Sequence, residues 1–145
     1  MSGEWPCCAE PLPEEVRRGL EQFNAGEYFE QHETLEHAWR AETRPVRELY
    51  QGILQIGVAC YQIQRGNYAG ALKMLRRGLA HLAPVPDHCQ GIDVARLRED
   101  ALRLLRQLEE LGPEGCRRID ERQLPRVIFA PKYGLQEGPE FSPDA

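Results

Sequence analysis

The 145-residue sequence lacks an excess of positive charge: 18 Lys and Arg face 23 Asp and Glu, giving a formal net charge of −5. Nucleic-acid-binding domains usually carry a basic face, so no nucleic-acid partner is expected. The chain also lacks an uninterrupted membrane-spanning run, because glutamines break up its most apolar stretch. Its first residues contain neither the basic segment nor the apolar core of a secretory signal. We therefore expect a cytoplasmic protein with no membrane partner.

The five cysteines lack the spacing of a disulfide framework or of a structural zinc site. Their number is odd, and no Cys-x-x-Cys pair occurs. We predict that all five are reduced thiols, with Cys60 a small core residue inside an apolar helix. The pairs Cys7-Cys8 and His88-Cys89 remain an alternative as metal ligands.

Apolar residues recur at helical spacing along most of the chain. Hydrophobic residues make up 41% of the sequence and charged residues 28%, which is typical of a globular domain. Turn and capping residues separate the apolar stripes: Gly26, Asn67, Asp93 and Gly112-Pro113. The fold class is therefore all-α, a single-domain antiparallel bundle of about five helices at residues 13–124. An extended Pro/Gly-rich tail is expected at 125–145, docking through Val127, Ile128 and Phe129.

The expected third helix, residues 46–64, has no charged residue between Leu49 and Gln64. A helix that is apolar over most of its circumference is buried on several sides. We therefore place this helix at the centre of the bundle.

The expected second helix, residues 27–42, carries polar groups on or beside its apolar stripe. Helical spacing predicts that His32 faces the core between Tyr28, Leu35 and Trp39. A row of neutral polar residues on the third helix offers partners for it, so we predict a polar seam inside an apolar shell. Such seams hold metals and small ligands in helical bundles. The candidate ligand-binding residues are His32, Glu33, Glu36, Arg40, Gln51 and Gln55.

The chemistry of this seam stays open at the level of sequence. A metal would use His32 and Glu36, although the spacing matches neither the His-Glu-x-x-His of zincins nor the Glu-x-x-His of di-iron bundles. A histidine beside carboxylates can act as a general base, but no nucleophile stands next to it. The simpler alternative is a structural histidine held by Gln55 or by a glutamate. No reaction and no cofactor are assigned.

A second interpretation is a protein-interaction or self-association module. The segment 66–79 resembles the second half of a tetratricopeptide repeat, with a Gly-polar-aromatic turn before a helix, and Gly26-Glu27-Tyr28 echoes it. This interpretation gives a structural role to Tyr28, Trp39, Gly66 and Asn67 and predicts a protein partner or a homo-oligomer.

The sequence also resembles a bacterial and archaeal family, domain of unknown function 309. The resemblance covers roughly residues 20 to 83 and implies a small all-helical fold without supplying a reaction. It rests on three segments, Phe23-Asn24-x-Gly26-x-Tyr28-Phe29-Glu30-x-His32-Glu33-x-Leu35-Glu36-x-x-Trp39-Arg40, Tyr50-Gln51-Gly52-Ile53-Leu54-Gln55, and Arg65-Gly66-Asn67 with Gly70-Ala71.

Overall fold

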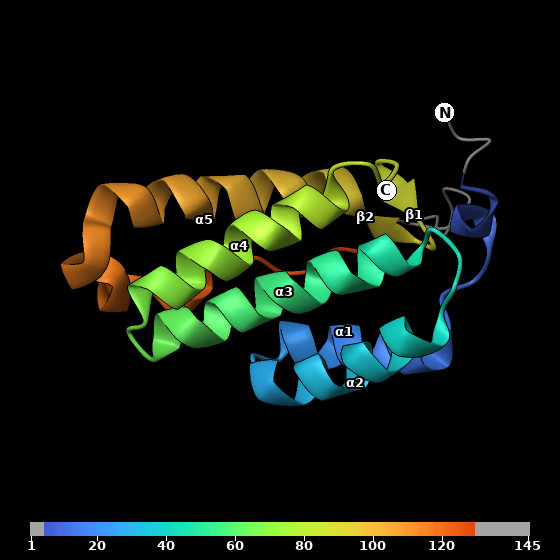
Figure 1. The fold of residues 1–145 in the computed structure, drawn as a ribbon, viewed down its shortest axis with the longest axis horizontal. Helices are drawn as coiled ribbons and strands as arrows, with labels where there is room; N and C mark the ends of the chain where they lie inside the picture. Colours follow the sequence, from blue (N-terminus) through green and yellow to red (C-terminus); the bar gives the residue numbers. More distant parts are fainter. Residues whose placement is uncertain (1–4, 130–145) are drawn as a thin grey trace, which may run out of the picture.

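Five helices account for most of the computed structural model, which describes residues 5–129 (Figure 1). The all-α class predicted from the sequence is confirmed. A two-stranded antiparallel hairpin, β1 (His88–Cys89) and β2 (Ile92–Asp93), precedes the last helix. The helices are α1 (Glu14–Asn24), α2 (Tyr28–Ala41), α3 (Arg47–Gln64), α4 (Tyr68–Leu82) and α5 (Val94–Gly115). Short 3₁₀ turns occupy Pro6–Ala9, Cys116–Arg118 and Glu121–Gln123.

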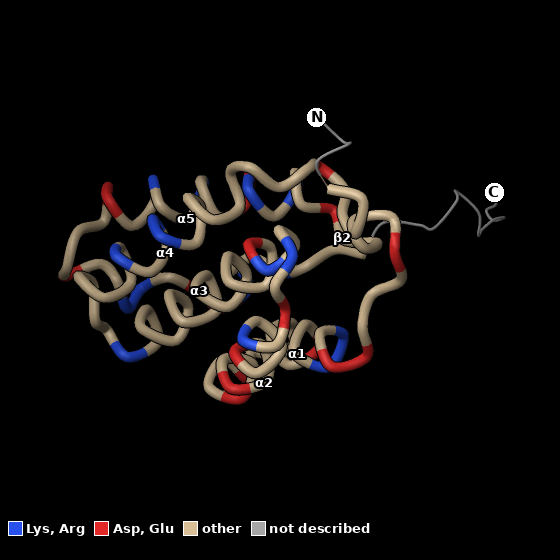
Figure 2. Tube along the Cα trace, turned by 45° about the vertical axis from the view of Figure 1, so that its right-hand side comes forward, with Lys and Arg blue, Asp and Glu red and all other residues tan. Residues whose placement is uncertain are grey.

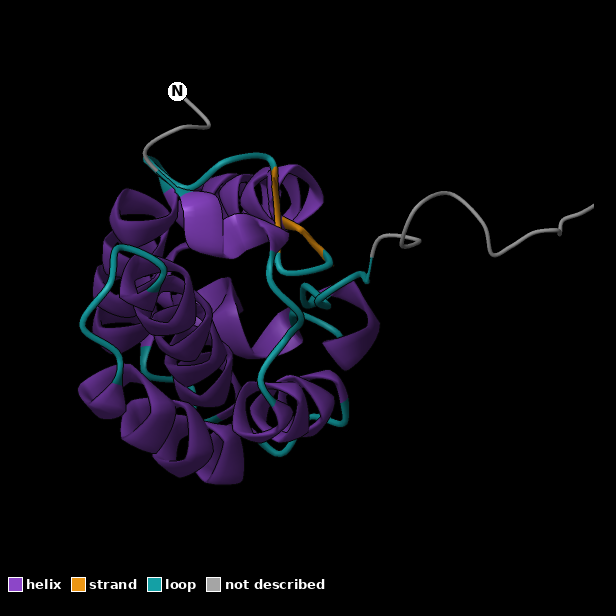
Figure 3. Cartoon of the chain, turned by 90° about the vertical axis from the view of Figure 1, so that its right-hand side faces the viewer, coloured by secondary structure: helices purple, strands orange, loops and turns teal. Residues whose placement is uncertain are grey.

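Helix α3 lies between α2 and α4, as its lack of charged residues predicted (Figure 1). Consecutive helices pack against one another along the chain, and the view along the bundle shows them around a shared core (Figure 3). The fully buried side chains of α3 include Leu49, Tyr50, Ile53 and Ile56. Burial of apolar surface stabilises a fold by about 25 cal/mol per Å², and α3 has more buried residues than any other of the five helices.

The predicted turn and capping residues act as expected. Gly26 adopts φ 80°, a left-handed conformation that ends α1 without the steric cost of a Cβ. The side-chain oxygens of Asn67 and Asp93 each accept a hydrogen bond, 3.0 Å long, from the backbone N–H three residues later. Gly112, at φ 70°, interrupts α5 just before Pro113.

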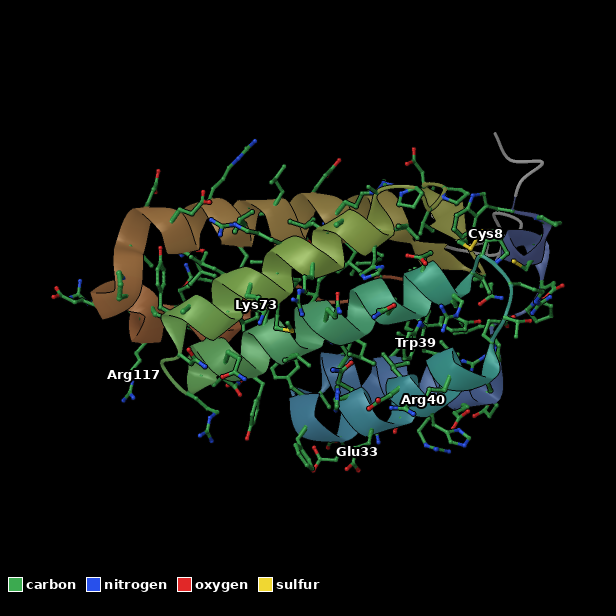
Figure 4. The ribbon with its side chains drawn as sticks, viewed as in Figure 1. Cys8, Glu33, Trp39, Arg40, Lys73 and Arg117 are labelled. Atoms are coloured by element: carbon green, nitrogen blue, oxygen red, sulfur yellow. A yellow bond between two sulfur atoms is a disulfide. The ribbon has the colours of Figure 1, made fainter. Side chains whose placement is uncertain are left out.

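A disulfide joins Cys8 to Cys89, so the prediction of five reduced thiols is wrong for this pair (Figure 4). The N-terminal 3₁₀ turn packs on the hairpin, where the backbone N–H of Gln90 donates to the Cys8 carbonyl over 2.7 Å. Because their sulfurs are bonded to each other, Cys8 and Cys89 cannot serve as the thiolate metal ligands of the alternative interpretation. Cys7, Cys60 and Cys116 are free and buried. Burial in an apolar site raises the pKa of the Cys60 thiol to about 12.

The chain after Leu124 runs back along the bundle in an extended conformation up to Phe129. Asn24, the last residue of α1, clamps it: its Nδ2 donates to the Val127 carbonyl over 2.9 Å, and its Oδ1 accepts from the Val127 N–H over 2.8 Å. Val127 is buried, as expected, whereas the side chains of Ile128 and Phe129 are exposed. The remainder of the predicted tail, 130–145, lies outside the described residues, and the boundary at 124/125 stays a prediction. Over 5–129, no helix has both the length and the hydropathy required to cross a bilayer.

Candidate functional site

Helix α2 presents a different face to the core than its apolar spacing suggested. Its buried residues are Tyr28, Gln31, Leu35 and Ala38. The prediction that His32 faces the core is therefore wrong: its side chain is 40% exposed and lies at the edge of the interface with α3. Tyr28 and Leu35 keep their predicted buried positions, whereas Gln31 and Ala38 replace His32 and Trp39, so the buried face is turned by about half a residue, roughly 50°, from the prediction.

A close contact with α3 sets this rotation. The side-chain amide of Gln31 lies across Gly57, where a Cβ atom on residue 57 would overlap the amide. Its Nε2 donates to the backbone carbonyl of Leu54 over 3.2 Å. Gln31 is fully buried, so α2 approaches α3 through a polar side chain that fits only over a residue without a side chain.

The side chains of three predicted residues contact one another in a row along the solvent-facing edge of α2. His32 Nε2 lies 3.6 Å from Glu36 Oε1, and Arg40 Nη2 donates to Glu36 Oε2 over 2.8 Å. The hydrogen bond from Arg40 lowers the pKa of the Glu36 carboxyl, and the charges of Arg40 and His32 act in the same direction. Glu36 is therefore an ionised acceptor at neutral pH, held between a guanidinium and an imidazole.

The other predicted residues are divided between the surface and the interface. Glu33 is exposed on the side of α2 away from α3, whereas Trp39 lies between the two helices (Figure 4). Gln51 and Gln55 on α3 are partly buried. The structure thus brings His32, Glu36 and Arg40 into contact, while Glu33 lines an open surface depression beside Glu36 and Arg40 without an ion pair to residues 5–129.

Of the four buried side-chain polar atoms without partners among residues 5–129, three belong to α2 and α3, and the fourth, Oε1 of Gln22, belongs to α1. Among the described residues, Oε1 of Gln31, Oε1 of Gln55 and Nε1 of Trp39 are buried and make no hydrogen bond. The Arg47 guanidinium covers the Trp39 ring at 4.5 Å from its centroid, which shields the indole from solvent. The polar seam predicted from His32 and the glutamates is therefore not buried: His32 and Glu36 are partly exposed, and the buried polar atoms of this interface belong to Gln31, Gln55 and Trp39.

A shallow apolar groove of about 160 Å³ adjoins His32. The Phe29 side chain at its rim is 55% exposed and packs against Tyr61 with ring centroids 6.4 Å apart. Tyr28 of α2 and Val58 and Gln62 of α3 complete the lining. Sequence spacing did not single out Phe29, the first residue of the Phe-Glu-x-His-Glu segment, or Tyr61 as site residues, whereas Val58 and Gln62 belong to the third-helix row expected to face His32.

The structure supplies few ligands for a metal at this position. Within residues 5–129, no group of three or more His, Cys, Asp or Glu side chains is arranged to hold a metal ion. His32 and Glu36 alone would provide two ligands, and a bound ion would need the rest from water or from another molecule.

The variant Arg40→Gln tests the charge interactions among His32, Glu36 and Arg40. The pKa of Glu36 should rise toward its ordinary value of 4.5 in R40Q, because the strongest hydrogen bond to the carboxylate is lost. In the wild type, Glu36 makes its full contribution to stability above pH 4.5, and this contribution is lost as the pH falls through the lowered pKa. The free energy of unfolding of R40Q should therefore depend less on pH in the acid range. Carboxyl ¹³C NMR titration measures the shift. The control R18Q removes an exposed arginine of α1, and an equal change there would contradict the assignment.

The chain is similar in sequence to one known protein family and to uncharacterized bacterial proteins. Residues 16–74 match the model of a family described as Domain of unknown function (DUF309). An uncharacterized protein of Aquifex aeolicus (strain VF5) is 25% identical over 77 residues, which cover 52% of this chain and 23% of that protein.

The uncharacterized protein YpuF of Bacillus subtilis (strain 168) is 33% identical over 97 residues, 64% of this chain and 56% of YpuF. The chain thus spans about a quarter of the length of one curated relative and just over half of the other. The family match contains all of α2 and α3, and with them every candidate site residue from His32 to Gln55. The resemblance inferred from the sequence is therefore confirmed: residues 16–74 of this chain match Domain of unknown function (DUF309).

Proposed function

We propose that this chain binds a small polar ligand where α2 meets α3. His32, Glu36 and Arg40 would form the mouth of this site. Gln55 and Trp39 would form its back. The single observation that carries the proposal is the set of buried polar atoms without partners in this interface.

Leaving a buried donor or acceptor without a partner costs about 1–3 kcal/mol. Native structures keep few such groups, and those that persist often contact a ligand, an ion or water. Here the unpartnered atoms are of both kinds: the indole N–H of Trp39 is a donor, and the amide oxygens of Gln31 and Gln55 are acceptors. A molecule that carries both a donor and an acceptor, such as an amide or an alcohol, complements them.

The mouth of the site favours the same class of ligand. Glu36 is an ionised acceptor, and the imidazole of His32 can donate or accept according to its tautomer. Arg40 already balances the Glu36 charge, so the mouth does not demand a cationic ligand. The apolar rim formed by Phe29 and Tyr61 can contact the carbon skeleton of the ligand. We infer binding as the function and assign no chemical step.

The two tryptophans of the chain give this proposal an internal control. In ¹H–¹⁵N spectra of the whole chain, titration with small amides, beginning with acetamide, should shift the indole N–H signal of Trp39. The indole signal of Trp5, which lies in the N-terminal segment, should stay in place. A parallel titration with Zn²⁺ tests the metal alternative through the ring signals of His32.

A pair of matched variants separates a specific site from general weakening. Gln55→Leu removes the buried acceptor and should abolish the Trp39 shift, whereas Gln64→Leu, at the exposed end of α3, should leave it unchanged. If no amide moves the Trp39 signal, or if Q55L and Q64L respond alike, the proposed ligand site is refuted.

Self-association is a second candidate function, favoured by the exposed Phe29. Large apolar side chains on a surface often mark an interface. Glu30 and Glu33 follow Phe29 on α2. At the end of α3, the guanidinium carbon of Arg65 lies 5.5 Å from the centroid of the Tyr61 ring. A twofold pairing of two copies would place the acidic side of one against the basic side of the other.

Analytical ultracentrifugation tests this pairing. A dimer at micromolar concentration should dissociate in Phe29→Ser, because the variant removes the apolar centre of the contact. Leu102→Ser changes an exposed leucine of α5 and should leave the dimer intact. A wild-type chain that remains monomeric at all accessible concentrations would eliminate this candidate.

A further inference from the structure

A groove of about 640 Å³ lies between α5 and the returning segment 122–128, away from the site described above. Figure 2 shows several Lys and Arg positions along α4 and α5. Two acidic residues, Asp100 and Glu110, also line the groove, so its lining carries five positive and two negative charges, a balance of +3, although Arg122 is also ion-paired with Asp120. The positive residues are Arg96, Arg103, Arg106, Arg122 and Arg126.

One carboxylate organises two of these arginines. The Asp100 side chain is only 11% exposed, and its Oδ2 accepts a 3.0 Å hydrogen bond from Arg96 Nε. Its Oδ1 accepts from Arg103 Nη2. A single negative charge therefore fixes two guanidiniums, and both Nη groups of Arg96 keep their donors free of hydrogen bonds to residues 5–129.

Two further arginines present donors to the same groove. Arg106 makes no ion pair or side-chain hydrogen bond with residues 5–129, although Glu110 follows it one helical turn later. Arg126 donates one Nη1 hydrogen bond, 2.9 Å long, to the carbonyl of Asn24, which orients the side chain and leaves Nε and Nη2 for another acceptor.

The wall opposite α5 is held in place by hydrogen bonds to its backbone groups. Asn24 clamps Val127 from both sides, and the N–H of Asp93 donates to the Ile128 carbonyl over 2.9 Å. These contacts leave the Ile128 side chain 37% exposed on the wall of the groove. The groove is thus a preformed concavity with guanidinium donors and one accessible apolar side chain.

We propose that this groove binds a small organic phosphate. Guanidinium groups bind phosphate oxygens through paired, charge-assisted hydrogen bonds, and the groove volume lies in the range of small-molecule sites. The exposed Ile128 would contact the organic part of the ligand. Asp100 and Glu110, together with the negative charge of the whole chain, disfavour a long nucleic acid, which needs a continuous basic track.

Calorimetric titration of the full chain with ADP and with pyrophosphate tests the proposal. Arg106→Gln and Arg126→Gln should each weaken ADP binding about tenfold, the effect of losing one charged hydrogen bond. Arg77→Gln removes one positive charge from an exposed position on α4 outside the groove and should leave the affinity unchanged. Ile128→Ala should weaken ADP binding but not pyrophosphate binding.

Loss of binding in the two groove variants with retention in R77Q supports the proposal. Absence of ADP binding, or equal losses in all three arginine variants, would overturn it. A 20-nucleotide single strand that binds more tightly than ADP would also overturn it, because the ligand would then be an extended polyanion. A normal circular dichroism spectrum for each variant shows that the fold is intact and that a lost affinity belongs to the groove.

Discussion

The crossing of α2 over α3 depends on one contact, the Gln31 amide lying on Gly57. The amide donates to the Leu54 carbonyl, and this hydrogen bond fixes both the separation and the rotation of the two helices. Because Gln31 takes the central buried position, its neighbour His32 turns toward the edge of the interface. The placement of every candidate site residue on α2 follows from this rotation.

The rotation divides the polar residues of this interface into two sets. His32, Glu36 and Arg40 are accessible and paired with one another, and their ionic interactions contribute little stability because solvent screens them. Gln55 and Trp39 belong to the interface and hold buried atoms without partners. In the proposed function, the first set would meet a ligand arriving from solvent and the second set would gain hydrogen bonds from it. The contact of α3 with α4 also contains a polar pair, but there His81 Nδ1 and Glu48 Oε1 bind each other at 2.6 Å.

The sequence was sufficient to predict what local patterns determine. The five helices, the caps at Asn67 and Asp93, the left-handed Gly26 and the central place of α3 all follow from spacing and turn chemistry within a few residues. The rotation of α2 could not be found in this way, because Gln31 and His32 are adjacent polar residues and either fits the apolar stripe. Gly57 inside the most apolar helix was the available signal of a close approach.

Contacts between distant segments were also beyond the reach of local patterns. The disulfide joins residues 81 positions apart, and Asn24 clamps a residue 103 positions later. Both depend on how the N-terminal turn and the C-terminal segment pack on the finished bundle. The groove lined by arginines has the same origin, since the segment that forms its second wall is placed by the Asn24 clamp.

A double-mutant cycle in chemical denaturation measures the contact between Gln31 and Gly57 most directly. Gly57→Ala should destabilise the wild-type chain by about 1–3 kcal/mol through overpacking. In a Gln31→Ala background the added methyl group has room, so the same change should be neutral or stabilise by up to about 1 kcal/mol through helix propensity. If Gly57→Ala has the same effect in both backgrounds to within about 0.5 kcal/mol, the two residues are not coupled and this contact does not set the helix crossing.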